Sequence, residues 1–443
     1  MVIFPMENMV SKPPKKLLIN LFQAALEAVD PYGCTARYID DLPSLYDRLF
    51  VLGFGKAVSP MLKAVMDRVG DRINRGVIVT KYSHLGPMDD RGIIQCFEAG
   101  HPLPDEKGLQ ATAEVINLLR QADEKTLIVC LISGGGSALL VAPSEGITLA
   151  EKQKTTELLL KAGADITELN TVRKHISQVK GGRLAELASP ARIKSLILSD
   201  VLGDRLDVIA SGPTAPDMTT YEEAWHILEK FALIERVPES VLNVLIKGRQ
   251  GILLDTPKEG HPLFQRVDNT IIGGNLEALK AAEGEAARLG YATEIISSEI
   301  SGEAREAGRW LGEKALVVLE RIRRSGLRKI CLISGGETTV TVTGRGKGGR
   351  NMELALAFAQ KVDGTEGVSF LSAGTDGTDG PTDAAGAIVD GQTMIRARDK
   401  GLDPQLYLLE NNSYHFFRQT DELLITGPTR TNVMDIQVML LQV

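Results

Sequence analysis

The stretch TLIVCLISGGGSALL, residues 126–140, joins an uncharged apolar run to a Ser/Gly turn and to the start of a second apolar segment. An apolar run without alternation is typical of a strand that is buried on both faces of a sheet. The same order of apolar strand, Gly/Ser turn and helical pattern recurs at 49–69, 193–204, 269–290 and 328–340. Because strands that alternate with helices usually pair in parallel beneath covering helices, the sequence predicts an α/β fold.

A short internal echo and the length of the chain predict two domains. Cys130–Gly135 and Cys331–Gly336 share the sequence CLISGG, which favours two α/β domains that each end a central strand in a Ser-Gly-Gly turn. Chance similarity of two short buried strands is the alternative. The chain has 443 residues, more than one ordinary core accommodates. The predicted domains are residues 1–240 and 241–443, and residues 1–45 can pack on either of them.

The composition is that of a globular protein with small-molecule partners. Hydrophobic residues make up 43% and charged residues 24%, and the net charge of −7 disfavours binding to nucleic acid. The four cysteines have neither CxxC nor zinc spacing, which predicts a reducing, cytoplasmic location. The longest apolar run, residues 127–142, is interrupted by the Ser/Gly turn, so neither a membrane span nor a membrane partner is expected.

A first glycine-rich turn is a candidate phosphate site. Gly53 and Gly55 follow an apolar strand and precede Lys56, so a phosphate can approach the backbone and meet a mobile positive charge. Val58 stands where the dinucleotide fingerprint needs its third glycine, and the pattern GxxxxGK[ST] is absent from the whole chain. A purely structural turn is the alternative.

A second turn gives a stronger signal. It places three successive glycines between two hydroxyl side chains after a buried strand, and its exposed amides suit a phosphate or a carboxylate. The related segment 334–339 adds a carboxylate, which repels phosphate unless a metal lies between them. The predicted phosphate-binding residues of the second turn are Ser133, Gly134, Gly135, Gly136 and Ser137.

Charged side chains in other loops are further candidates. Arg173 and Lys180 lie in two neighbouring segments rich in basic residues, which fit either an anion site or a solvated helix face. Asp200 follows the predicted strand 195–198, at the end where open α/β sheets keep reactive groups. It can orient a hydroxyl group, accept its proton or hold a magnesium ion. Arg350 ends a basic, Gly-rich loop that can close over phosphates.

Acidic residues in one segment are candidate metal ligands. Residues 372–383 are rich in Asp, Gly and Thr, and Asp376 and Asp379 are the predicted ligands, although the same residue types also make ordinary turns. The turn at residues 100–105 contains His101, which is expected to be structural rather than a substrate contact. The histidines show no ligand spacing for a catalytic zinc ion.

In this order the motifs resemble the class II glycerate 2-kinase family, whose C-terminal half is called the MOFRL domain. The resemblance extends from about residue 17 to the end of the chain. The segments that carry it are GFGKA (53–57), AGHPLPD (99–105), LISGGGSALL (131–140), NTVRKHIS (170–177), KGGRLA (180–185), LSDVLGD (198–204), ASGPT (210–214), SGGETTVTV (334–342), GKGGRN (346–351), AGTDGTDGPTDAAG (373–386) and TGPTRTNV (426–433).

The resemblance implies a fold and an activity. It implies an N-terminal Rossmann-like domain with a parallel sheet, a C-terminal MOFRL α/β domain, and an active site in the cleft between them. The implied enzyme is a phosphotransferase that moves the γ-phosphoryl group of ATP to the 2-hydroxyl of D-glycerate, giving 2-phosphoglycerate and ADP. Lys56, Asp200 and Arg350 match the family's proposed active-site residues. Met352 stands where the family commonly has Gln, which removes the basis for a polar contact from this position.

The expected mechanism relies on positioning and charge. Asp200 would orient or deprotonate the hydroxyl, Lys56 and Arg350 would offset charge on the transferring group, and Mg²⁺ would bridge the phosphates with Asp376 or Asp379 as ligands. ATP and Mg²⁺ are thus the expected cofactors, glycerate is the partner, and a homodimer is left open. The alternatives are a hydroxypyruvate reductase that uses NAD(P)H, a kinase of another small sugar acid, and a non-catalytic ligand-binding protein.

Overall fold

A computed structural model describes residues 13–40, 42, 46–86 and 92–443, and the chain divides into two compact units. The first unit is Pro31–Ile272, and the second is Gly273–Val443 together with residues 13–30. The boundary expected at 240/241 falls inside the first unit, at the start of α10 (Glu239–Arg249). The unit extends further because β6 (Val267–Gly273) is the last strand of its sheet.

The N-terminal segment contributes to both units. Helix α1 (Pro13–Ala28) packs against α11 (Asn275–Arg288) of the second unit, whereas α2 (Pro31–Ile39) packs against α3 (Val58–Val69) of the first. In α1 the apolar residues Leu18, Leu21, Phe22 and Ala25 are fully buried, and their spacing places them on one face of the helix.

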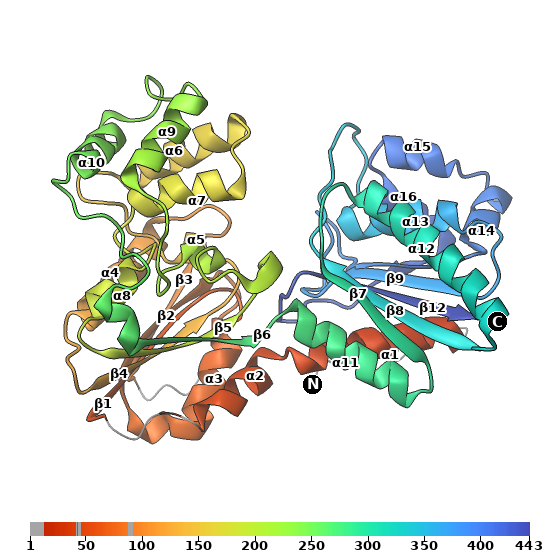
Figure 1. Cartoon of the computed structure of the whole chain (residues 1–443), viewed down its shortest axis with the longest axis horizontal. Coiled ribbons are helices and arrows are strands. Elements are labelled where there is room, and N and C mark those ends of the chain that lie inside the picture. The colour runs from red at the N-terminus through yellow and green to blue at the C-terminus, as the bar shows by residue number, and fades with distance from the viewer. Residues whose placement is uncertain (1–12, 41, 43–45, 87–91) are drawn as a thin grey trace. The chain divides into compact units, whose positions relative to one another are not determined.

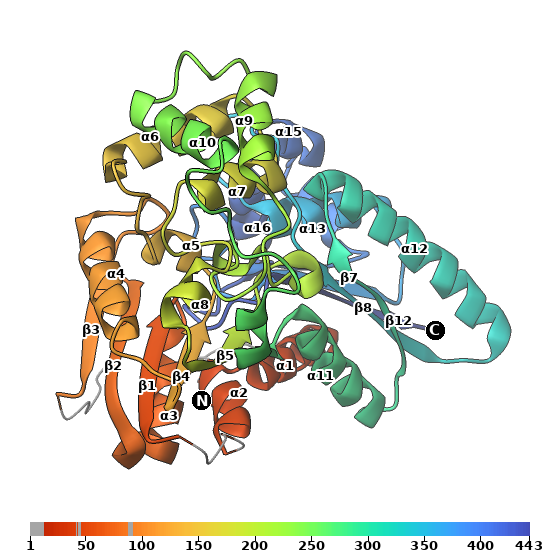
Figure 2. The same ribbon diagram turned by 60° about the vertical axis from the view of Figure 1, so that its left-hand side comes forward.

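The first unit is built on a six-stranded sheet in the order β3-β2-β1-β4-β5-β6 (Figure 2). Strands β1 to β5 pair in parallel, and the order reverses between β1 and β4, as in doubly wound α/β folds. The strands before β6 are β1 (Arg48–Phe54), β2 (Ile73–Lys81), β3 (Ile94–Ala99), β4 (Thr126–Ile132) and β5 (Arg192–Leu198).

Helices cover both faces of this sheet. Leu49 and Val51 of β1 belong to the apolar core under α2 and α3, and Phe50 and Leu52 belong to the core under α4 (Glu106–Leu119) and α8 (Arg183–Ala188). All seven residues of β4 are buried, which confirms the prediction of a strand with two buried faces.

Four further helices of the first unit form a separate apolar core with Leu159, Val172, Tyr221 and Leu245 among its members. Capping boxes fix where three of these helices begin, because Thr148, Asp165 and Thr220 each accept an amide hydrogen bond from a glutamate three residues later. The helices are α6 (Leu149–Lys161), α7 (Ile166–His175), α9 (Tyr221–Lys230) and α10.

The second unit has a mixed sheet in the order β11-β10-β9-β12-β8-β7, with α1 and α11 on one face and α12 and α13 on the other (Figure 1). Strands β7 and β8 are parallel, and the remaining pairs are antiparallel. The elements are β7 (Ala292–Ile300), α12 (Ala304–Ser325), β8 (Lys329–Gly336), α13 (Arg350–Lys361), β9 (Val368–Gly374), β10 (Gly386–Asp390), α14 (Thr393–Asp399), α15 (Pro404–Leu409), α16 (Ser413–Thr420), β11 (Leu423–Leu424) and β12 (Asp435–Gln442).

The two copies of CLISGG have different structures. Ser133–Gly135 follow the end of β4, as expected, but Ser334–Gly336 continue β8 because β12 pairs with that strand as far as Gly336. The prediction of a Ser-Gly-Gly turn in both domains is therefore right for the first unit and wrong for the second. The short helices not yet named are η1 (Gly70–Arg72), α5 (Gly136–Leu139), η2 (Leu202–Asp204), η3 (Ile209–Ser211) and η4 (Pro262–Arg266).

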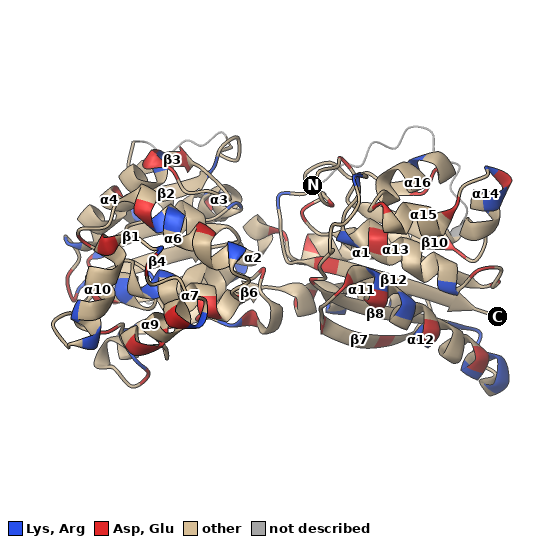
Figure 3. Cartoon of the chain, turned by 90° about the horizontal axis from the view of Figure 1, so that it is seen from above, with Lys and Arg blue, Asp and Glu red and all other residues tan. Residues whose placement is uncertain are grey.

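Two general features of the described residues concern the helices and the distribution of charge. Within the described ranges, no helix is both long enough and apolar enough to cross a bilayer. Lys and Arg residues are interspersed with Asp and Glu over both units in the view of Figure 3.

Candidate active site

The predicted residues of the first unit follow neighbouring strand ends. Lys56 follows β1, the turn that begins at Ser133 follows β4, and Asp200 follows β5. Because β1, β4 and β5 are parallel neighbours, these ends lie at one edge of the sheet. The order of the strands reverses between β1 and β4, and ligands of open α/β sheets bind at such a reversal.

Hydrogen bonds join the two glycine-rich turns. The amide of Lys56 donates to the Gly134 carbonyl at 2.9 Å, and the amide of Ala57 donates to Ser133 Oγ at 3.0 Å. A β-carbon on Gly55, where φ is +135°, would lie 2.2 Å from that same Oγ, so only glycine fits. Gly55 and Ser133 therefore hold the two turns together, which accounts for both without a ligand.

Gly53 was predicted to bind phosphate, but it lies within β1 rather than in the turn. A β-carbon there would lie 2.2 Å from Val58 Cγ2. The glycine thus allows α3 to pack closely on the strand. The local structure explains Gly53 by packing and gives it no exposed position.

Three polar side chains converge on Gly134 and Gly135. A β-carbon on Gly134 would lie 2.1 Å from Asp200 Oδ2. One on Gly135 would lie 3.0 Å from His101 Nε2 and 3.3 Å from Lys56 Cγ. The structure therefore brings Lys56 and Asp200, two of the predicted catalytic residues, to the same turn. It adds His101, which sequence reasoning had assigned to a structural role.

His101 is uncharged at neutral pH in this setting. Burial is the main cause that lowers its pKa to about 4, and the positive charges of Lys56 and Lys81 lower it further. The cluster therefore offers one ammonium group, one carboxylate and one neutral imidazole around two glycines. Such a set can bind an anionic substrate, accept a proton and form neutral hydrogen bonds.

Two cations meet at the far end of the second turn. Arg173 Nη2 donates to Ser137 Oγ at 2.8 Å, and Lys180 Nζ donates to the Ser137 carbonyl at 2.7 Å and to Oγ at 3.2 Å. Both cations can only donate, so the Ser137 hydroxyl must give its own proton to Ser211 Oγ, 2.5 Å away. Ser211 in turn donates to Asn170 Oδ1 at 3.1 Å. The predicted residues Arg173 and Lys180 thus position the turn directly.

Lys180 and Arg173 have no carboxylate partner among the described residues, although Lys180 is fully buried and Arg173 is partly buried. Lys180 is fully buried, and its pKa lies well below the usual range because of burial and the nearby charges of Arg173 and Lys152. Burial lowers the pKa of Arg173 to about 10. Within the described part of the chain, neither side chain forms an ion pair with Asp or Glu. An anion beside Ser137 would favour the charged form of Lys180 and would offset the charge of Arg173.

Arg350 of the second unit is paired twice. It is the first residue of α13, and its Nε and Nη2 donate to the two oxygens of Asp435 at 2.6 and 2.9 Å. Its Nη1 lies 2.7 Å from Glu337 Oε1. Burial alone would lower the pKa of Arg350, but the bonds to Asp435 and the charge of Glu337 raise it. The side chain was expected on a flexible loop, whereas the structure fixes it between two carboxylates.

The predicted metal ligands have other partners. Both oxygens of Asp379 accept amide hydrogen bonds, from Asn351 at 3.1 Å and from Met352 at 2.8 Å, and so cap α13. Asp376 Oδ1 accepts from the amide and hydroxyl of Thr378, each at 3.0 Å. Among the residues that the structure places, no three His, Cys, Asp or Glu side chains are grouped around a potential metal position. Asp376 and Asp379 therefore form no ready-made cation site.

Burial explains two features of α13 and its cap. Desolvation raises the pKa of Asp379 to about 7, and the charge of Asp435 also favours its protonated form. Met352 is fully buried, so an apolar side chain is compatible with its place in the helix. The absence of the family's usual Gln leaves no unpaired polar group at this position.

Sequence reasoning missed several residues of these clusters. Asp435 begins β12, whose other residues are mostly apolar, and this lone carboxylate was the available signal. Ser211 lies within the ASGPT motif, where its hydroxyl had no assigned role. Neither partner could be identified from spacing, because Ser211 lies 74 positions from Ser137 and Asp435 lies 85 positions from Arg350.

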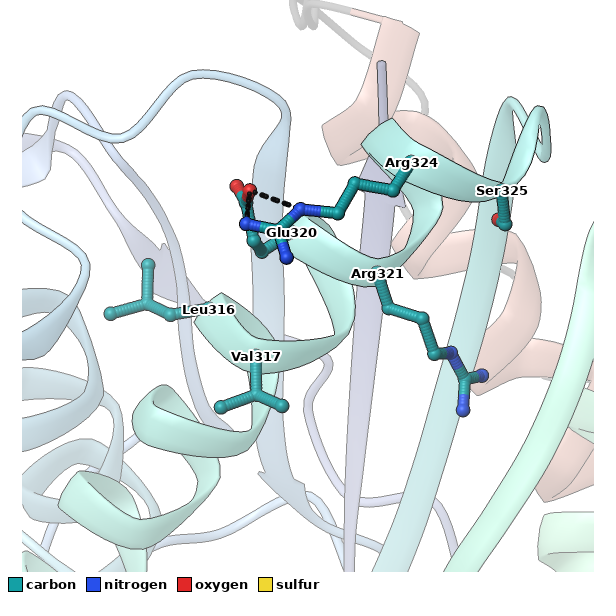
Figure 4. A pocket seen from close by; sticks show the side chains of 6 residues that line it. All are labelled: Leu316, Val317, Glu320, Arg321, Arg324 and Ser325. Carbon is teal, nitrogen blue, oxygen red and sulfur yellow. Dashed lines mark hydrogen bonds and ion pairs between the residues drawn. The ribbon is translucent and has the colours of Figure 1, made fainter.

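A surface hollow on α12 lies apart from the predicted residues in the sequence (Figure 4). Its lining contains one ion pair, in which Arg324 Nε donates to Glu320 Oε1 at 3.0 Å, and the strongly exposed Val317. It has no convergent polar groups of the kind that orient a small ligand. The lining residues are Leu316, Val317, Glu320, Arg321, Arg324 and Ser325.

Comparison with known proteins covers nearly the whole chain. Residues 17–246 match a domain of unknown function (DUF4147), and residues 330–435 match the MOFRL family. The chain is 46% identical over 425 residues to D-glycerate 2-kinase of Thermotoga maritima, with 95% of this chain and 97% of that protein covered. It is 42% identical over 441 residues to glycerate 2-kinase of Pyrococcus horikoshii, with 97% and 98% covered. An Agrobacterium vitis protein named putative hydroxypyruvate reductase is 38% identical over 432 residues, with 96% and 94% covered.

A solved structure agrees with these relatives. The crystal structure of glycerate kinase from Thermotoga maritima superposes with a TM-score of 0.87 at 46% identity, covering 97% of this chain and 99% of that one. The first family model alone matches more than half of the chain. These findings confirm the family that the eleven motifs indicated, and the chain belongs to the class II glycerate kinases with a MOFRL domain.

Proposed function

We propose that this protein transfers the γ-phosphoryl group of ATP to the 2-hydroxyl of D-glycerate. The observation that carries the proposal is the convergence of Lys56 and Asp200 on Gly134 and Gly135, at the reversal point of the sheet. Phosphoryl transfer needs an oriented hydroxyl and stabilisation of negative charge more than it needs covalent chemistry from the protein. The cluster supplies one group for each requirement.

Asp200 and Lys56 have complementary roles in the proposed reaction. The 2-hydroxyl oxygen forms a bond to the γ-phosphorus while the bond from that phosphorus to the β-phosphate oxygen of ATP breaks. The hydroxyl proton passes to the Asp200 carboxylate, and ADP leaves with the electron pair of the broken bond. Lys56 offsets the charge of the transferring group. Its side chain lies beside Gly135, so the charge and the base act at adjacent backbone positions.

The cations at Ser137 hold an anionic part of a substrate. Lys180 is fully buried and Arg173 is partly buried, neither has a carboxylate partner in the described ranges, and both fix the turn that includes Gly136. An anion placed against this turn would offset their mutual repulsion. We assign the phosphates of ATP to this end of the turn.

Arg350 is proposed to act on negative charge through Nη1. Its contact with Asp435 is buried, but the side chain of Glu337 is 43% exposed and can be exchanged for an anionic ligand. Asp435 would then keep the guanidinium oriented during the exchange. This differs from the mobile loop that the sequence indicated.

Magnesium is proposed as the counter-ion of ATP, without a full set of protein ligands. Asp379 does not fit the ligand role because both of its oxygens cap α13. Asp376 uses one oxygen for Thr378 and keeps the other for a ligand. Magnesium usually keeps several waters and binds phosphates with one or two carboxylates, so such a sparse contribution is sufficient.

The expected setting is cytoplasmic, with small molecules as the partners. No disulfide joins the four cysteines, all of which lie in described segments, and burial raises the pKa of Cys331 to about 12, which makes it unreactive. A reducing compartment agrees with this usage. Gel filtration with light scattering would decide between a monomer and the homodimer that the sequence left open.

The proposal can be tested directly on the unmodified protein. ATP, Mg²⁺ and D-glycerate should give ADP, and phosphorus NMR should identify 2-phosphoglycerate. A parallel reaction with hydroxypyruvate and NADH or NADPH tests the activity named for the Agrobacterium vitis relative. Nicotinamide oxidation without ADP release would overturn the kinase proposal. ADP release only with other sugar acids would change the substrate and keep the reaction type.

A further inference from the structure

We propose that His101 binds the hydroxyl group of the substrate that is not phosphorylated, and so selects glycerate over hydroxy acids that lack it. This inference rests on the proposed kinase function. It concerns a residue that the sequence assigned to a structural turn and that the mechanism above does not use.

The imidazole lies against the turn that carries the other reactive groups. A β-carbon on Gly135 would lie 2.9 Å from His101 Cδ2 and 3.0 Å from His101 Nε2. The same β-carbon would lie 3.3 Å from Lys56 Cγ. Gly135 also has φ of +83°, which side chains rarely adopt. The missing side chain at Gly135 thus leaves room for both the imidazole ring and the side chain of Lys56.

The ring nitrogens of His101 have no partner within the described part of the chain. His175 of the same unit is a structural histidine, because both of its ring nitrogens form hydrogen bonds within the protein. Its Nδ1 bonds the Thr171 carbonyl at 2.7 Å and its Nε2 bonds Asp255 at 2.9 Å. His175 is fully buried, whereas His101 is only half-buried and accessible to a ligand. A half-buried imidazole without a hydrogen bond to any described residue is suited to bind a ligand.

The chemistry of a neutral imidazole selects the group that it binds. One ring nitrogen donates and the other accepts, whereas carboxylate and phosphoryl oxygens can only accept. A hydroxyl group can do both. Burial and the positive charges of Lys56 and Lys81 disfavour the protonated imidazole of His101, so the ring stays neutral. Asp200 is assigned to the reacting hydroxyl, which leaves the hydroxyl on carbon 3 of glycerate for His101.

The test compares D-glycerate with D-lactate, which lacks only that hydroxyl. The catalytic efficiency kcat/KM is measured for glycerate, and the inhibition constant of lactate is measured against glycerate phosphorylation. His101→Ala should lower kcat/KM for glycerate at least about tenfold, the scale of one lost hydrogen bond. The inhibition constant of lactate should change less than about threefold. His101→Asn, which keeps a donor and an acceptor, should recover part of the loss for glycerate.

Controls separate the possible failures. His226→Ala removes an exposed histidine from α9 and should leave both constants unchanged. If wild-type protein does not phosphorylate glycerate, the proposed function fails rather than the role of His101. Equal losses of glycerate efficiency and lactate affinity would contradict the selection of a hydroxyl, and so would unchanged constants. Circular dichroism and thermal melting of each variant identify a folding defect. If His101→Ala fails to fold, His101→Asn decides the outcome: its loss of kcat/KM for glycerate must exceed its change in the inhibition constant of lactate.

Discussion

The turn cluster of the first unit and the Arg350 network of the second both concentrate charge, but they differ in how the protein neutralises it. In the described residues, the ammonium group of Lys56 has no partner, whereas the Arg350 guanidinium faces two carboxylates at 2.6 to 2.9 Å. A cluster with unpaired groups is suited to receive a ligand, and a paired network is suited to stabilise a fold. The comparison teaches that a charged residue in a family motif need not act primarily on substrate.

The largest expected effect is on catalysis by the first cluster. Lys56→Ala should lower kcat/KM for glycerate about a thousandfold, because it removes the unpaired charge beside the transferring group. The melting temperature should remain close to that of the wild type, since no partner of Lys56 is left buried. ADP release gives the rate, and Lys63→Ala, which changes an exposed lysine of α3, is the control. A loss of kcat/KM smaller than about threefold would contradict the catalytic role of Lys56, and with it the proposed difference between the two clusters.

Arg350→Ala should damage the fold of the second unit in addition to any effect on catalysis. The substitution leaves Asp435 buried without its partner, and the expected loss is about 3 to 5 kcal/mol in the free energy of unfolding. Glu337→Gln breaks only the exposed pairing and should cost less than about 1 kcal/mol. Denaturant unfolding of both variants gives the difference, and similar losses would show that the buried contact is not special.

The shape of the second turn should affect activity at a smaller scale. Gly135→Ala strains a residue at φ +83° and places a β-carbon against His101, so kcat/KM should fall about tenfold. Gly146→Ala strains a similar φ of +86° where no atom lies within 4 Å. Both variants should lose about 1 to 2 kcal/mol of stability, but only the first should lose activity. Equal losses of kcat/KM in the two variants would mean that backbone strain, rather than the contact between a β-carbon at 135 and His101, lowers the activity.

Much of the fold could be predicted because the apolar runs indicate the buried strands directly. The strand Leu127–Ile132 has no polar residue, and the alternation of strands with helices gives the α/β class. The position of β6 could not be predicted, because a strand that completes a distant sheet leaves no local mark. Lys56 and Asp200 were found because both stand at the ends of strands.

The rest of the candidate site depends on contacts that spacing does not encode. His101 follows a different strand from Lys56 and reaches the turn only because Gly135 has no side chain. Asp379 was interpreted as a metal ligand because its segment is rich in Asp and Gly, yet its oxygens cap a helix that begins 29 positions earlier. A cap of this kind has no sequence signature, since the capping carboxylate is distant in the chain.

The smallest expected effect is on the pH dependence of stability, and it tests whether the second network is structural. The pKa of Asp379 is about 7 in the fold, against 3.8 for an ordinary aspartate. Between these values the folded state holds a proton that the unfolded state does not. The free energy of unfolding therefore falls as pH rises from about 4 to about 7, and this contribution is level above that range.

Asp379→Asn removes the titration and keeps one acceptor for the α13 amides. The melting temperature of the wild type should exceed that of the variant by more at pH 5 than at pH 8, by a few degrees on the scale of this chain. Asp435 is present in both proteins, so its own raised pKa affects both melting curves. Asp376→Asn controls for the loss of one negative charge from the same segment. A difference that stays constant from pH 5 to pH 8 would mean that Asp379 is ionised throughout, and its carboxylate would then be a stronger candidate for a cation than its two amide bonds indicate.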